Sequence, residues 1–135
     1  MPGPHRGNAR LYPATRRLHG ARIEPIVQSS AGSVPRLSVV IVARNEERNL
    51  PRCLASVCGW TDEIIVALNG TTDGSEAVAR GAAAAVHHLP WRGYRDTKND
   101  ALGLARNNWV LALDADEEVS PELRREITAF LAGGD

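Results

Sequence analysis

Two aspartates follow directly after a short apolar run near the end of the sequence. The run is WVLAL (109–113), and Asp114 and Asp116 come next with one alanine between them. In an extended segment, residues i and i+2 point to the same side, so the two carboxylates would share one face. Like charges this close repel unless a cation neutralises them, as Mg²⁺ or Mn²⁺ bridging a diphosphate would. The alternative is a solvated acidic loop in which Glu117 and Glu118 lead into the next helix.

Lys98 is the only lysine of the chain and a second candidate group. It lies in a segment with helical spacing, and its ammonium could meet a base carbonyl or a phosphate. A solvent-exposed helical lysine is the alternative. Arg92 and Arg95 flank the same loop, and either could help to bind phosphate. The three tryptophans have no spacing typical of a carbohydrate platform, so we expect them to be packing residues: Trp60, Trp91 and Trp109.

The segments that would position these groups alternate between strands and helices. Apolar runs predict strands at 37–43, 63–68, 83–88 and 109–113. Helical spacing predicts helices between them and after the last strand, with three residues as N-caps: Asn45, Asp73 and Ser120. This alternation is typical of right-handed βαβ units, so we expect an α/β fold of Rossmann-like type, with a mostly parallel sheet of about four strands flanked by helices.

Ligands of such sheets bind beyond the carboxyl ends of the strands. The segments that follow the predicted strands are 43–46, 68–74, 87–99 and 114–118, and all are polar. The candidate carboxylates and the candidate lysine therefore fall at one edge of the predicted sheet.

Residues 1–36 differ from the rest in composition. They carry six arginines and a single acid, although the whole chain has a formal net charge of zero. Because they show no helical or strand period, we expect a disordered, dispensable basic leader, with contact to an anionic membrane surface as an alternative role. Residues 37–135 would form the folded domain. The start shows no secretory signal, which favours a cytoplasmic protein, either free or peripheral at the inner membrane.

Three blocks, at 37–57, 62–75 and 91–123, carry a resemblance that covers roughly residues 37–131: LSVVIVARNEERNLPRCLASV, DEIIVALNGTTDGS and WRGYRDTKNDALGLARNNWVLALDADEEVSPEL. Together they resemble the nucleotide-binding half of inverting family 2 glycosyltransferases with the GT-A fold, in the branch of lipopolysaccharide-core glucosyltransferases. The resemblance implies a loop that holds the nucleoside and contains Ala43, Arg44, Asn45 and Glu46. It further implies that Lys98 contacts the donor, that Asp114 leans toward the ribose and that Asp116 faces the metal ion.

One position departs from the family pattern. Leu68 stands where the family usually has an aspartate that binds the base. Asn69 could supply an amide from the neighbouring position, although adjacent strand residues face opposite ways unless the turn starts early. Asp73 is interpreted as a helix cap, with a structural role.

The resemblance implies a nucleotide-sugar donor, most simply a uridine one, bound with Mg²⁺ or Mn²⁺ for sugar transfer in cell-envelope polysaccharide or lipopolysaccharide synthesis. No nucleic acid is expected, and the glycine-rich signatures of dinucleotide and ATP sites are absent from the sequence. In this family the acceptor half and the catalytic base follow later in the chain, so we name no catalytic residue and expect donor binding without transfer. The alternative is a truncated, non-catalytic remnant, or a binding module that needs a partner chain to supply the acceptor half.

Overall fold

The computed structural model describes residues 9–13, 15–18, 22–25 and 36–133. Four parallel strands form the centre of one sheet: β4 (Leu37–Ala43), β5 (Glu63–Leu68), β6 (Ala85–His88) and β7 (Trp109–Asp114). Four helices accompany them: α1 (Leu50–Ala55), α2 (Ser75–Gly81), α3 (Tyr94–Leu102) and α4 (Pro121–Leu131). The α/β class and the four predicted strands are confirmed.

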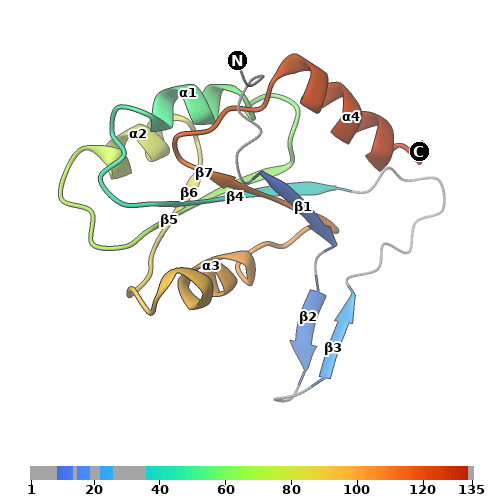
Figure 1. Cartoon of the computed structure of the whole chain (residues 1–135), viewed down its shortest axis with the longest axis horizontal. Helices are drawn as coiled ribbons and strands as arrows, with labels where there is room; N and C mark the ends of the chain where they lie inside the picture. The colour runs from blue at the N-terminus through green and yellow to red at the C-terminus, as the bar shows by residue number, and fades with distance from the viewer. Residues whose placement is uncertain (1–8, 14, 19–21, 26–35, 134–135) are drawn as a thin grey trace.

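A fifth strand comes from the predicted leader. β1 (Arg10–Pro13) pairs antiparallel with β7, and the sheet order is β1-β7-β4-β5-β6. A separate antiparallel hairpin, β2 (Thr15–Leu18) and β3 (Arg22–Pro25), extends away from the sheet (Figure 1). The expectation of disorder is therefore wrong for these three segments, because β1 pairs with the distant strand β7, and β2 and β3 pair with each other. Residues 1–8, 14, 19–21 and 26–35 lie outside the described part.

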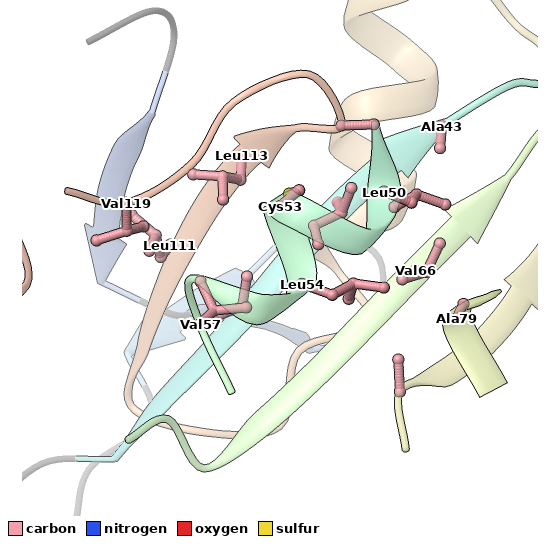
Figure 2. Packing of buried hydrophobic residues seen from close by; sticks show 14 of the residues in the cluster. Ala43, Leu50, Cys53, Leu54, Val57, Val66, Ala79, Leu111, Leu113 and Val119 are labelled. Carbon is pink, nitrogen blue, oxygen red and sulfur yellow. The ribbon is translucent and has the colours of Figure 1, made fainter. Parts of the chain in front are cut away.

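The helices cover the two faces of the sheet unequally. α1, α2 and α4 lie on one face and α3 on the other (Figure 1). Strand β4 serves both faces: Val39 and Ile41 belong to the larger core with α1, α2 and α4, whereas Val40 belongs to the smaller core with α3. Figure 2 shows how α1 inserts its buried side chains into the larger core. This alternation follows from the period of two along a strand.

Two of the predicted N-caps are displaced. The first helix begins at Leu50, with Asn49 rather than Asn45 as N-cap. Pro51 explains this start, because proline is tolerated in the first turn of a helix and disrupts its interior. The second helix begins at Ser75, with Gly74 as N-cap. The nearby carboxylate of Asp73 nevertheless binds the helix start by accepting from the Ser75 N–H at 2.9 Å.

The last helix begins as predicted. The Ser120 hydroxyl accepts a hydrogen bond from the Leu123 N–H at 3.0 Å, and Pro121 occupies the first turn. Ile127 and Leu131 are buried against the sheet. Within the described part of the chain, no helix combines the length and the apolar character that a membrane span requires.

Candidate functional site

A cavity of about 250 Å³ lies at the carboxyl edge of the sheet, on the face that α3 covers. This volume is near the lower end of ligand pockets, which hold about 300 to 1,000 Å³. Six of the eight predicted site residues line it: Ala43, Arg44, Glu46, Asn69, Lys98 and Asp114. The remaining lining residues are Val40, Val42, Trp91, Tyr94, Leu102, Ala112 and Leu113. Segments that are distant in the sequence thus meet in one hollow with an apolar wall and a polar rim.

The end of β7 lies along this cavity, with Ala112, Leu113 and Asp114 in its lining. At the end of β5, Leu68 is fully buried in the core of the opposite face, whereas Asn69, 6% exposed, lines the cavity. The Asn69 amide is therefore available at the cavity, whereas the Leu68 side chain lies in the core on the other face of the sheet. A hydrogen bond joins the ends of β4 and β5, because the Asn69 N–H donates to the Ala43 carbonyl at 3.2 Å.

Helix α3 supplies the wall opposite the strand ends. Tyr94, Lys98 and Leu102 follow at intervals of four residues, which places them on one face of the helix, and all three line the cavity. The Lys98 ammonium lies 5.5 Å from the centroid of the Tyr94 ring. Lys98 is half-buried and lines the cavity, so it is not a fully exposed helical lysine, and its contact with a donor stays a prediction.

The two arginines beside this helix lie outside the cavity lining. The Arg92 guanidinium pairs with the Asp100 carboxylate through bonds of 2.9 and 2.8 Å, and this arginine lowers the pKa of Asp100. Arg92 therefore fastens the loop to the helix that follows it. Arg95 is exposed. The structure thus gives no support to a phosphate role for either side chain.

Asn45 ties the loop after β4 to the loop after β5. Its backbone has a positive φ of 52°, a conformation that asparagine tolerates better than most residues. Its side-chain Oδ1 accepts from the backbone N–H groups of Thr72 at 2.8 Å and Asp73 at 3.3 Å. In return, the Glu47 N–H donates to the Asp73 carboxylate at 3.2 Å. Asn45 does not line the cavity, so its predicted contact with a donor stays a prediction.

The Asp114–Asp116 segment is a turn rather than an extended strand. β7 ends at Asp114, and the next two residues form the turn, so the extended geometry assumed for the carboxylate pair is wrong. Asp114 is half-buried and lines the cavity, whereas Asp116 is exposed and lies outside the lining. Among the described residues, no group of three or more His, Cys, Asp or Glu side chains could hold a metal ion.

Sequence reasoning missed two features of this region. Trp91 is 60% exposed and lines the cavity with Tyr94, so the expectation that it is a packing residue is wrong. The expectation is confirmed for Trp109, whose ring packs edge-to-face on Phe130 at 5.0 Å. It is also confirmed for Trp60, which packs against the larger core and donates to the Ser56 carbonyl at 2.9 Å. The second missed feature is Glu117, a carboxylate only 4% exposed beside the turn.

The residues that line the cavity lie within a match to a known protein family. The family model described as Glycosyl transferase family 2 matches residues 38–135, which is most of the chain. The chain belongs to glycosyltransferase family 2. The match contains the whole cavity, from β4 to the Asp114–Asp116 turn.

Relatives of this family member extend well beyond it. An uncharacterised glycosyltransferase of Rickettsia typhi is 41% identical over 97 residues, which are 72% of this chain and 33% of that protein. The lipopolysaccharide core biosynthesis glycosyltransferase LpsC of Rhizobium meliloti is 34% identical over 106 residues, covering 73% of this chain and 38% of LpsC. The chain thus spans about a third of the length of the curated relatives it matches.

Solved structures agree on the fold. Glucosyl-3-phosphoglycerate synthase from Mycobacterium tuberculosis, in complex with Mn²⁺, uridine diphosphate and phosphoglyceric acid, has a TM-score of 0.59 at 25% identity. The match covers 75% of this chain and 40% of that one. Residues 1–349 of Staphylococcus aureus TarS have a TM-score of 0.63 at 22% identity, covering 73% of this chain and 32% of TarS. These neighbours are GT-A glycosyltransferases.

Proposed function

We propose that this chain is the donor-binding part of a family 2 glycosyltransferase and that its cavity binds a uridine-diphosphate sugar. One observation carries the proposal: Arg44, Asn69, Lys98 and Asp114 come from four separate segments and line the same cavity. The similarity to a synthase solved with uridine diphosphate and Mn²⁺ supports this choice of ligand.

The lining residues offer a matching group for each part of such a donor. Arg44 and Lys98 are cations that can bind phosphate oxygens, and the Asn69 amide can both donate to and accept from a base edge. Trp91 and Tyr94 provide aromatic faces at the cavity, on which a base or sugar ring could stack. The Glu46 carboxylate can accept hydrogen bonds from ribose or sugar hydroxyls.

The residues present also fit a divalent metal ion. Mg²⁺ is usually bound by one or two carboxylates together with substrate phosphates and waters, rather than by a complete protein cage. In this proposal Asp116 is the carboxylate that binds the metal ion, together with the donor phosphates and waters, and Asp114 is the carboxylate that leans toward the ribose. When bound, the ion supplies Lewis-acid neutralisation of the leaving diphosphate.

The contribution of the described residues to sugar transfer is then binding and orientation. Arg44 and Lys98 would hold the diphosphate, and the apolar wall of Val40, Val42 and Leu102 would exclude water beside it. Transfer joins an acceptor hydroxyl oxygen to the anomeric carbon as the diphosphate leaves. We assign the base for that step to no residue of this chain.

The similarity to LpsC supports an acceptor in the cell envelope. We propose sugar transfer in lipopolysaccharide or related polysaccharide synthesis, at the cytoplasmic face of the inner membrane. The arginines of residues 1–36 could contact anionic lipid there.

Calorimetric titration with uridine diphosphate, with and without Mn²⁺, tests the proposal. The parent chain should bind the nucleotide, and Mn²⁺ should tighten binding. Asp116→Asn should remove most of the effect of Mn²⁺, because an amide is a poorer ligand for a hard cation than a carboxylate. Glu126→Gln, a change of the same kind at an exposed position of α4, should bind like the parent. Absence of nucleotide binding by the parent would refute the function, and an unchanged Mn²⁺ effect in Asp116→Asn would refute the metal assignment.

A further inference from the structure

We propose that Glu117 is a positioning residue that holds the Asp114–Asp116 turn in the shape that binds the metal ion of the donor complex. This inference rests on the proposed function and assigns a role to a carboxylate that the donor does not need to touch. Glu117 is 4% exposed, although the acids on both sides of it, Asp116 and Glu118, are exposed.

The side chain of Glu117 folds back onto the first residue of the turn. Its Oε1 accepts from the backbone N–H of Asp114 at 2.8 Å. Its own backbone N–H donates to the Asp114 carbonyl at 3.0 Å. Glu117 thus binds both backbone groups of Asp114 and closes the turn that carries Asp116.

Asp114 is the last residue of β7, where it is paired with Val42 of β4 on one side. The described ladder between β1 and β7 stops at the pair Arg10 and Ala112, two residues before Asp114. From α1, the thiol of Cys53 adds a long contact of 3.7 Å to the Asp114 carbonyl. On the side of β1, the Glu117 and Cys53 side chains therefore contact the Asp114 backbone where the described β1 ladder has already ended, while β4 pairs with it on the other side.

A turn held in this way would matter more for metal binding than for the nucleotide. Asp116, the proposed metal ligand, lies in the turn that Glu117 closes, whereas Lys98 and Asn69 lie on other elements. Groups that orient metal ligands without touching the ion typically contribute about 10- to 100-fold in affinity. Loss of the Glu117 contact should therefore weaken Mn²⁺-dependent binding and spare metal-free nucleotide binding.

Two substitutions of Glu117 test separately whether the length of its side chain or its negative charge holds the turn. Glu117→Gln keeps the length of the side chain and an acceptor oxygen but removes the charge. Glu117→Asp keeps the charge but is one methylene shorter, which withdraws the acceptor from the Asp114 N–H. Glu118→Gln is the matched control, because Glu118 is exposed and pairs with Arg52 at 3.1 Å. It removes one charge beside the turn without touching Asp114.

The experiment measures uridine diphosphate binding by calorimetry in Mn²⁺ and in EDTA, together with hydrogen exchange of the Asp114 amide in the ligand-free chain. Glu117→Asp should lose about tenfold or more of the Mn²⁺-dependent affinity and expose the amide to faster exchange. Glu117→Gln should stay within about threefold of the parent with a protected amide, and Glu118→Gln should match the parent. All variants should bind alike in EDTA.

The opposite pattern would overturn the proposal. If Glu117→Asp keeps the Mn²⁺-dependent affinity and Glu117→Gln loses it, then the negative charge of Glu117 matters and its hydrogen bond to Asp114 does not. Equal behaviour of the two Glu117 variants would overturn it as well. If the parent itself does not bind, the proposed function fails too. If the parent binds and only the variant pattern differs, the role of Glu117 alone is refuted. Circular dichroism of each variant shows whether it is folded, and the exchange rate at Asp114 reports the contact without any ligand.

Discussion

Replacement of Asn45 tests whether this residue holds two loops together. Its side chain accepts two backbone hydrogen bonds, at 2.8 Å from Thr72 and 3.3 Å from Asp73, in an exposed part of the edge. Each such bond contributes about 0.5 to 1.5 kcal/mol, and water replaces part of it at an exposed site. We therefore expect Asn45→Gly, which tolerates the φ of 52°, to lower the free energy of unfolding by about 1 to 2 kcal/mol.

Asn45→Ala should be worse by about a further 1 kcal/mol, because alanine adopts the left-handed conformation less readily. For a domain of about 100 residues, each kcal/mol corresponds to about 4 to 8 °C in Tm. Thermal unfolding followed by circular dichroism without ligand measures the order parent, glycine, alanine, with Arg48→Ala as an exposed neighbouring control. If both Asn45 variants melt with the parent and uridine diphosphate affinity nevertheless falls tenfold, Asn45 contacts the donor directly and the loop-tie explanation is wrong.

Three further predictions follow from packing and burial. Deleting residues 1–14 should lower Tm and promote aggregation, because it removes the strand that covers the edge of β7 and the Leu11 side chain that packs against the larger core. An unchanged melting curve would contradict this. Iodoacetamide at pH 8 should alkylate exposed Cys58 but leave Cys53 unmodified until the chain unfolds, which mass spectrometry can measure, since burial raises the pKa of Cys53 to about 12. Gly74→Ala should lower Tm only slightly, because its Cβ would displace the flexible Glu47 side chain, whose carboxylate lies 2.9 Å away and accepts from the Gly74 N–H, and Gly81→Ala, with open space, should not lower it.

The central strands could be predicted because their signal is local. Residues 37–43 and 63–68 are strands in the structure with the same bounds, since each is a continuous apolar run that only a buried parallel strand uses well. β1 could not be predicted, because RLYP is ordered by Trp109 to Ala112, about a hundred residues later in the chain. The start of α1 was misplaced because Asn45 is held by a distant loop instead of capping a helix.

The site could be predicted as far as the strand ends determine it. The carboxyl edges of parallel strands bring Ala43, Asn69 and Asp114 together whatever lies between them. The apolar wall could not be predicted, because the sequence does not say which face of the sheet α3 covers. Glu117 has the same local signature as the exposed Glu118 beside it, so only the tertiary structure separates the two acids.

Paramagnetic broadening of amide signals by Mn²⁺ in the presence of uridine diphosphate tests most directly whether donor and metal bind at this edge. Titration with uridine diphosphate and Mg²⁺ first should shift the amides of Asn69 and Lys98, and replacing Mg²⁺ by Mn²⁺ should then broaden the signals of Asp114 to Asp116 most strongly. Ile127 and Leu131, buried in α4 on the other face of the sheet, should remain sharp. Broadening centred on α4, or the same broadening with and without the nucleotide, would contradict a metal-dependent donor site at the carboxyl edge of β4, β5 and β7.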